Sequence, residues 1–168
     1  MIERSTSNRS RDCQTDRVTT PTPIVRLISL DEAMPIRLHV LRRGTPAREA
    51  NYEGDDDARS VHIGAEIDGR IVATSTWLVA PWPEDPATTA IQLRGMAVLD
   101  ELQGTGIGQA LISAGINHAH TMSARYVWAK ARDSALDFYR RCDFRVVGEQ
   151  FIEPASGMPH HLVVLDMA

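Results

Sequence analysis

Hydrophobic and polar residues alternate along two neighbouring stretches in the middle of the chain. VHIGAEI (61–67) and IVATSTWLV (71–79) both show a period of two, and the triplet DGR lies between them. Such alternation is typical of strands with one buried face, and an Asp-Gly pair between two strands favours a tight turn. The pattern therefore predicts a β-hairpin.

Shorter apolar runs predict five more strands, each bounded by turn residues or by a helical segment. The runs lie at 24–28, 91–99, 125–131, 144–151 and 161–167. A loop rich in proline and glycine separates the last two, which are therefore expected to form an antiparallel pair.

Helical periodicity replaces this alternation in three segments. The first segment begins after Ser29, because Ser29 and Glu32 have the spacing of a capping box. This helix is expected to extend to about Arg43, before Gly44, and Pro35 is expected to kink it or split it in two.

The other two helical segments lie on either side of the strand predicted at 125–131. Residues 106–122 predict a long amphipathic helix, and residues 133–142 predict a short helix capped by Asp133 or Ser134. Strands and helices in this order indicate an α/β (α+β) fold with three layers and mixed strand directions.

Composition indicates one domain. The chain has 168 residues, 43% of them hydrophobic, and we expect residues 24–168 to form a single domain with a sizeable core. Residues 1–23 are polar and end in TPTP, so they are expected to be a disordered N-terminal tail. The two cysteines, Cys13 and Cys142, form no disulfide framework, and no histidine or cysteine spacing fits a metal site.

Charge and hydropathy argue against two classes of partner. The net charge of −4 is unlike that of a nucleic-acid-binding domain, which needs a basic face. No apolar run is long enough to span a membrane, and the N-terminal segment lacks the apolar centre of a secretory signal. We therefore expect a cytoplasmic protein with neither a nucleic-acid nor a membrane partner.

Three glycines crowd the junction between the strand at 91–99 and the helix after it, in LDELQGTGIGQA (99–110). Glycine in a helical turn costs about 1 kcal/mol relative to alanine, so a close ligand or a tight turn must require it. A P-loop would need lysine where Gln109 stands, and a dinucleotide fingerprint would need glycine at Gln109 or Leu111. A plain turn and a loop for another phosphate ligand remain open.

The second of these alternatives matches a known motif. Gln103, Gly106 and Gly108 fit the Q/R-x-x-G-x-G/A loop of the GCN5-related N-acetyltransferase (GNAT) superfamily, which holds the diphosphate of acyl-CoA. Unpaired amides at a helix start suit an anion without any basic side chain, and glycine lets that anion approach the backbone.

The flanking segments resemble the same superfamily. QLRGMAVL (92–99) resembles its central strand, and ARDSALDFYRRCDF (131–144) resembles its N-x-x-A-x-x-F-Y-x-x-x-G-F segment. Two positions depart from that segment. Arg132 replaces the asparagine, which puts a side-chain contact to CoA in doubt, and Asp143 replaces the glycine, where we expect only a turn to change.

This resemblance implies a GNAT-type sheet of about six to seven strands, mixed but mostly antiparallel, with helices on both faces. It implies acetyl-CoA (coenzyme A) as co-substrate and no metal. Arg140 and Arg141 either stabilise the end of their helix or contact the 3′-phosphate of CoA. The residues expected to bind acetyl-CoA are Met96, Ala97, Val98, Gln103, Gly104, Thr105, Gly106, Ile107, Gly108, Ser134 and Tyr139.

The implied reaction is direct transfer of the acetyl group to the primary amine of a small molecule or peptide, in a ternary complex. The resemblance implies Tyr139 as the general acid that serves the departing thiolate. Candidates for the base or for another substrate contact are His62, Glu66 and His160 (or His161), unless ordered water takes the proton.

Three further expectations concern partners and the acceptor. The acidic run Asp55–Asp57 either attracts a cationic amine or is a solvated loop, and Trp82, between two prolines, is a candidate for the rim of the site. Pairing through the C-terminal strands would give a homodimer. The alternative to an enzyme is a non-catalytic acyl-CoA-binding module that acts as a sensor or as a partner of another protein.

Overall fold

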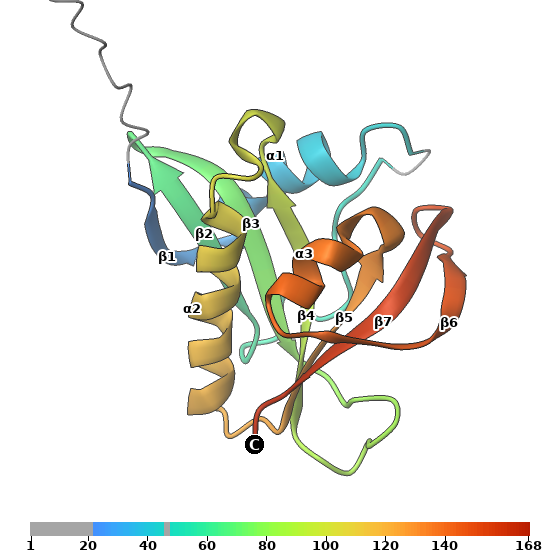
Figure 1. Ribbon diagram of the computed structural model, residues 1–168. Coiled ribbons are helices and arrows are strands. Elements are labelled where there is room, and N and C mark those ends of the chain that lie inside the picture. The colour runs from blue at the N-terminus through green and yellow to red at the C-terminus, as the bar shows by residue number, and fades with distance from the viewer. Residues whose placement is uncertain (1–21, 46–47) are drawn as a thin grey trace, which may run out of the picture.

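The computed structural model describes residues 22–45 and 48–168, and its centre is one seven-stranded sheet (Figure 1). The disordered tail expected at 1–23 lies, up to residue 21, outside the described residues and stays a prediction. The strands are β1 (Ile24–Ile28), β2 (Val61–Ile67), β3 (Arg70–Val79), β4 (Ala90–Val98), β5 (Tyr126–Arg132), β6 (Arg145–Glu153) and β7 (Met158–Asp166). All seven predicted strands are present.

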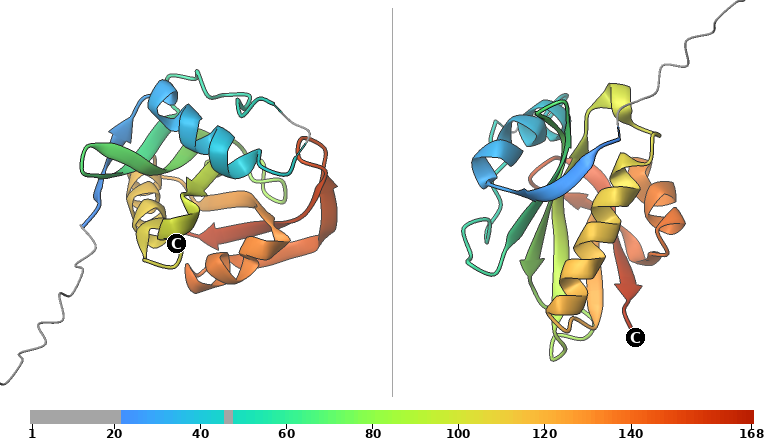
Figure 2. Two further views of the ribbon diagram at one scale, coloured as in Figure 1. Left: turned by 90° about the horizontal axis from the view of Figure 1, so that it is seen from above. Right: turned by 90° about the vertical axis from the view of Figure 1, so that its left-hand side faces the viewer.

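Helices cover both faces of this sheet. The α-helices are α1 (Leu30–Leu41), α2 (Ile107–Thr121) and α3 (Leu136–Arg141), and the 3-10 turns are η1 (Asp100–Leu102) and η2 (Asp133–Ala135). Figure 2 shows α1 on one face and α2 and α3 on the other. Within the described residues, no helix has both the length and the apolar character needed to cross a membrane.

The strands run in the order β1-β2-β3-β4-β5-β7-β6. Every neighbouring pair is antiparallel except β4 and β5, which pair in parallel. The expected fold class, a mixed and mostly antiparallel sheet flanked by helices, is therefore confirmed.

Local signals set the start of α1. The predicted capping box is present. The Glu32 amide donates to Ser29 Oγ at 3.2 Å, and the Ser29 amide donates to Glu32 Oε2 at 2.8 Å. The helix continues through Pro35, so the expected split was wrong. It ends at Leu41, slightly before the expected Arg43.

The start of α3 differs from the expectation. Asp133 and Ser134 lie in the preceding η2 turn, the N-cap is Ala135, and no side chain caps the helix. The Asp133 carboxylate instead contacts His161, at 2.9 Å from Nδ1, and accepts a hydrogen bond from Gln150. Partners that are distant in sequence have taken the oxygen atoms that a cap would have used.

Tryptophans fill two apolar clusters. Trp77 is fully buried in the main core, where α2 approaches it so closely that a Cβ atom on Gly115 would lie 1.8 Å from its ring. Trp82 is 1% exposed and packs on Trp128, with ring centroids 5.8 Å apart, in a smaller cluster. Trp82 is therefore a core residue, and the expectation that it rims the site was wrong.

Candidate active site

The sheet opens between β4 and β5. Their parallel ladder ends at the pair Leu93 and Ala129, and beyond this pair the two strands diverge. On the other side of β4 the register with β3 shifts, because Gly95 and Met96 together stand opposite Ser75. Gly95 has φ +56°, a left-handed conformation that favours glycine. This bulge and the divergence create the space for two cavities.

The first cavity, here named the loop cavity, has a volume of about 510 Å³ and lies beside the glycine loop. Two of the residues expected to bind acetyl-CoA do not line it: Ile107 is buried in the core, and the exposed Thr105 donates its hydroxyl to Leu102 O at 2.6 Å. The expected residues that do line it are Met96, Ala97, Val98, Gln103, Gly104, Gly106, Gly108, Ser134 and Tyr139.

Backbone conformation favours glycine at two of the three glycine positions of this loop. Gly104 has φ +78° and Gly106 has φ +91°, and Gly106 is the N-cap of α2, where no side chain caps the first amides. The Gln103 carboxamide donates to Val98 O at 3.2 Å and to Asp100 Oδ1 at 3.1 Å, which ties the loop to the end of β4. The loop thus presents unpaired amides to the cavity.

The arginines near the end of α3 have different surroundings. Arg141 lines the loop cavity, whereas Arg140 forms an exposed ion pair with Asp137 at 2.8 Å. Of these two arginines, Arg141 is therefore the one in position to meet a negatively charged ligand in this cavity.

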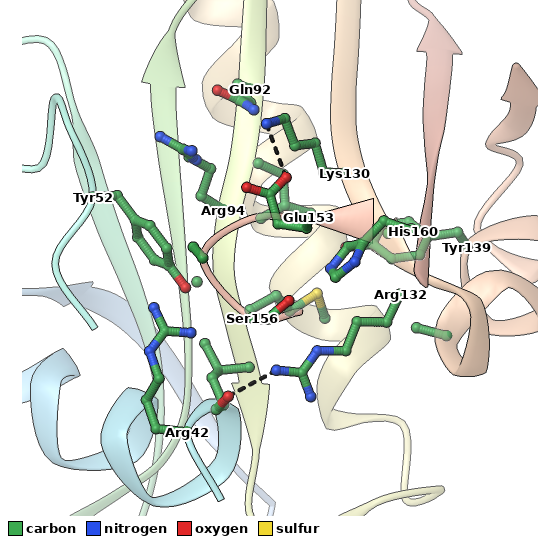
Figure 3. A pocket seen from close by; sticks show the side chains of 17 residues that line it. Arg42, Tyr52, Gln92, Arg94, Lys130, Arg132, Tyr139, Glu153, Ser156 and His160 are labelled. Atoms are coloured by element: carbon green, nitrogen blue, oxygen red, sulfur yellow. Dashed lines mark hydrogen bonds and ion pairs between the residues drawn. The ribbon is translucent and has the colours of Figure 1, made fainter. Parts of the chain in front are cut away.

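The second cavity, here named the basic cavity, has a volume of about 170 Å³ and is shown in Figure 3. Its walls come from the end of α1, the loop after it, β4, β5, the η2 turn, α3 and the β6–β7 hairpin. Lys130 Nζ lies 2.9 Å from Glu153 Oε2 across one end. The polar and charged residues of its lining are Arg42, Tyr52, Gln92, Arg94, Lys130, Arg132, Tyr139, Glu153, Ser156 and His160.

The two cavities meet at Tyr139, since Met96, Ala135 and Tyr139 line both. Tyr139 is 7% exposed, and its ring contacts Phe138 and Phe144 edge-on, with centroids 5.4 Å away in each case. Burial raises the pKa of the Tyr139 phenol well above its ordinary value, so this group stays protonated at neutral pH.

His160 is buried in the wall of the basic cavity (Figure 3). Its Nδ1 lies 2.8 Å from Met158 O. Because a carbonyl only accepts, Nδ1 must carry the proton in the neutral ring, and the lone pair is then on Nε2. His161 faces elsewhere, toward Asp133.

The remaining candidates line neither cavity. Glu66 accepts a hydrogen bond from Arg26 at 2.8 Å. His62 is buried, with Nδ1 2.7 Å from Thr76 Oγ1, and burial followed by the nearby Arg37 lowers its pKa. The structure therefore does not bring His62 and Glu66 together with His160.

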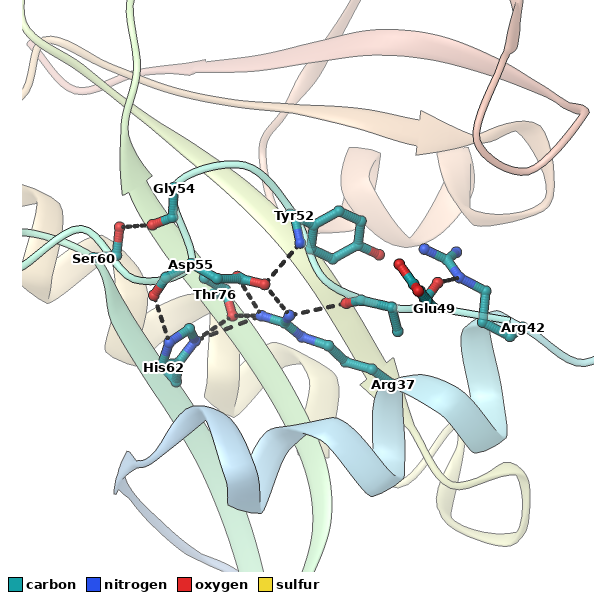
Figure 4. A network of polar contacts seen from close by, with 10 residues as sticks. Arg37, Arg42, Glu49, Tyr52, Gly54, Asp55, Ser60, His62 and Thr76 are labelled. Atoms are coloured by element: carbon teal, nitrogen blue, oxygen red, sulfur yellow. Dashed lines mark hydrogen bonds and ion pairs between the residues drawn. The ribbon is translucent and has the colours of Figure 1, made fainter. Parts of the chain in front are cut away.

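Figure 4 shows the buried network to which His62 belongs. Arg37, with no exposed surface, donates to both carboxylate oxygens of Asp55, at 2.7 and 3.0 Å. Asp55 also accepts from the Tyr52 amide at 2.8 Å, so the network holds Tyr52 in the wall of the basic cavity. Asp55 is thus neither solvated nor free to attract an amine, whereas Asp56 and Asp57 are exposed, so the solvated-loop alternative was wrong for Asp55 only.

Most of the charged residues that line the basic cavity were not predicted from the sequence. Arg42 and Glu153 stand in segments that carry no motif, and Arg94 lies in QLRGMAVL (92–99) but was not singled out there, so only the departure at Arg132 was a signal. Arg132 donates from Nη2 to Leu41 O at 2.7 Å and lines the basic cavity, whereas it does not line the loop cavity.

This combination of an open β4 edge, a glycine loop and two joined cavities agrees with a family comparison. The model of the acetyltransferase (GNAT) family matches residues 29–144. The chain belongs to this family. GNAT proteins are acyltransferases that use acetyl-CoA, and this GNAT chain is accordingly an acyltransferase.

Individual relatives of this GNAT chain are distant. The uncharacterized N-acetyltransferase YitI of Bacillus subtilis (strain 168) is 26% identical over 140 residues, which cover 83% of this chain and 93% of YitI. FeeM, an N-acyl amino acid synthase from uncultured soil microbes, has a TM-score of 0.75 at 12% identity, with 88% and 92% of the chains covered. Escherichia coli ElaA has a TM-score of 0.69 at 19% identity, with 85% and 99% covered. Both structures show the same fold.

Proposed function

We propose that this protein transfers the acetyl group of acetyl-CoA to the primary amine of a small molecule or peptide, by direct attack in a ternary complex. The observation that carries the proposal is the meeting of two cavities at Tyr139. One cavity suits the donor, and the other leaves room for an acceptor at the far side of the reacting thioester.

The loop cavity fits the donor in three places. The uncapped amides after Gly106 and the dipole of α2 favour the diphosphate. The β4 edge from Met96 to Val98, beyond the end of its ladder with β5, offers peptide groups to the pantetheine amides. Arg141 supplies a positive charge for the 3′-phosphate. Bound acetyl-CoA supplies the thioester carbon that the amine attacks.

His160 is the side chain best placed to take a proton from the acceptor. An alkylamine has a pKa of about 10.4, so it is mostly protonated at neutral pH and cannot attack in that form. His160 Nε2 has a free lone pair in the wall of the basic cavity, and the ring is held in that tautomer by Met158 O. The amine nitrogen then forms the new C–N bond while the C–S bond breaks, and the second proton that the nitrogen loses is taken up by the released thiolate.

Tyr139 acts on the departing sulfur. A phenol, with a pKa of about 10, is a weaker acid than a thiol, with a pKa of about 8.5, and burial raises the pKa of Tyr139 further. Full proton transfer to the thiolate is therefore uphill. We assign the phenol as a hydrogen-bond donor that stabilises charge as it develops on sulfur, which narrows the general-acid role expected from the resemblance.

The test is an assay of thiol release from acetyl-CoA across a panel of amines. Tyr139→Phe should lower kcat about 100-fold, as loss of one donor to a developing anion does, with little change in the KM for acetyl-CoA. Unchanged turnover would show that the Tyr139 phenol does not stabilise the departing sulfur. A wild-type protein that binds CoA but releases no thiol with any amine would contradict the proposal.

Gly106→Val tests the loop. Gly106 has φ +91°, where valine is strained and its side chain would block the approach of the diphosphate, so CoA binding should be lost. Gly69→Val is the matched control, because Gly69 has φ +77° in the β2–β3 turn and lines neither cavity. Equal loss of CoA affinity in both variants would refute the loop assignment.

A further inference from the structure

The basic cavity has more positive than negative charge. Arg42, Arg94, Lys130 and Arg132 line it, against the single carboxylate of Glu153, which lies next to Lys130. Across residues 22–45 and 48–168, no carboxylate oxygen lies within 4.0 Å of a side-chain nitrogen of any of these three arginines. Three arginines thus face one small cavity without an acidic partner.

The contacts these arginines do make are with neutral groups. Arg132 donates to Leu41 O at 2.7 Å, and Arg42 donates from Nε to Glu49 O. Arg94 lies over the Tyr52 ring, with Cζ 5.0 Å from the centroid. Because a guanidinium has five N–H donors, each arginine keeps donors for another acceptor.

Such an arrangement is unfavourable unless an anion enters it. Burial lowers the pKa of Arg132; Tyr52 raises it and the neighbouring Arg42 lowers it by less than burial does. The chain as a whole has a net charge of −4, so the cluster is a local exception rather than part of a generally basic surface. Arginine is well suited to a planar anion, since its guanidinium can donate two parallel hydrogen bonds to a carboxylate or phosphate.

We propose that the basic cavity binds an anionic group of the acceptor, so that the preferred acceptor is an amine that also carries a carboxylate or phosphate. Arg42, Arg94 and Arg132 hold this group, while the amine points toward Tyr139 and His160. This inference rests on the proposed function. The donor's own phosphates do not explain the cluster, because the glycine loop lines the other cavity.

Matched pairs of amines test the proposal. Each pair joins an anionic amine to the same amine without its anion: α-amino acids with their decarboxylated amines, and phosphoethanolamine with ethanolamine. The anionic member should have a kcat/KM at least about 10-fold higher, as expected for a charge-assisted hydrogen bond to arginine. The two kinds of pair distinguish carboxylate from phosphate.

The outcomes separate this inference from the proposed function. Equal thiol release with both members of every pair would overturn the inference and leave the acetyltransferase intact. If none of the amines supports thiol release, the proposed function is overturned. In that case calorimetric titration with N-acetylalanine and N-ethylacetamide still decides the inference, since only the former carries a carboxylate, and equal affinities would refute it.

Substitution of the arginines assigns the preference to the cluster. Arg132→Asn and Arg94→Gln should each reduce the preference for the anionic member over the neutral member about 10-fold. Arg43→Gln is the control, because Arg43 is exposed at the same end of α1 and pairs with Asp100. The ratio within a pair does not depend on how much variant is folded, so an unchanged ratio in both variants would overturn the assignment.

Discussion

The buried ion pair between Arg37 and Asp55 gives a quantitative prediction for Asp55→Asn. Asp55 is 6% exposed, and its carboxylate accepts three hydrogen bonds: two from Arg37, at 2.7 and 3.0 Å, and one from the Tyr52 amide at 2.8 Å. Asparagine has one acceptor oxygen where aspartate has two. In either orientation its NH₂ group therefore faces a donor, and the Arg37 charge is left buried without a counter-charge.

Removing one partner of a buried pair costs about 3–5 kcal/mol in the free energy of unfolding. For a domain of this size, roughly 2–4 °C of melting temperature corresponds to about 1 kcal/mol, so Asp55→Asn should lower Tm by roughly 6–20 °C. Urea unfolding and thermal melting followed by circular dichroism measure both quantities.

Asp56→Asn is the control for this measurement. It makes the same chemical change one residue later, on an exposed side chain. Surface substitutions of this kind alter the free energy of unfolding by about 0.5 kcal/mol at most. If Asp55→Asn costs no more than Asp56→Asn, the network contributes nothing to the fold, and the argument that it positions Tyr52 fails as well.

Three other predictions concern stability. A Cβ atom on Gly115 would lie 1.8 Å from the Trp77 ring. Gly115→Ala should therefore lower the free energy of unfolding by about 1–3 kcal/mol despite the better helix propensity of alanine; urea unfolding measures the loss, and a gain would show that α2 is not packed so closely. Asp143 has φ +66° after the end of α3. Asp143→Gly should therefore raise the free energy of unfolding by up to about 1 kcal/mol and raise Tm slightly; a lower Tm would contradict the argument that the left-handed backbone at Asp143 is strained. Burial lowers the pKa of His62 and of His118, so the unfolded chain binds those protons more tightly. The free energy of unfolding should accordingly fall as pH decreases below about 6.5; urea titrations at about pH 7.5 and 5.5 test this, and equal stability at both would refute it.

Local sequence signals were sufficient for most of the fold. Alternation located β2 and β3, a capping box located the start of α1, and both depend on residues a few positions apart. The predicted side-chain cap of α3 was wrong because the Asp133 carboxylate contacts His161 and Gln150 instead. Contacts between segments that are distant in sequence leave no local sequence pattern.

The candidate site was predictable on one side only. The loop cavity is built mainly from two neighbouring segments whose glycine and aromatic spacing the sequence displays, and the prediction that these residues bind acetyl-CoA stays untested. The basic cavity gathers single residues, such as Arg42 and Glu153, from segments without a motif. Trp82 looked exposed between prolines, yet it is buried by Trp128, which no local signal indicates.

The single parallel pair explains why the sheet opens where it does. Antiparallel neighbours can be joined by a two-residue turn, but parallel neighbours require a crossover connection long enough to return the chain to the same edge. Between β4 and β5 that connection is α2, so the start of a helix necessarily lies at the carboxyl end of β4. Both strands end at the same edge, and there they spread apart. Because the other strand pairs of this sheet are antiparallel, the β4–β5 pair is the place where two strands diverge next to the N-terminus of the helix that connects them. Gly104, Gly106 and Gly108 lie at this place.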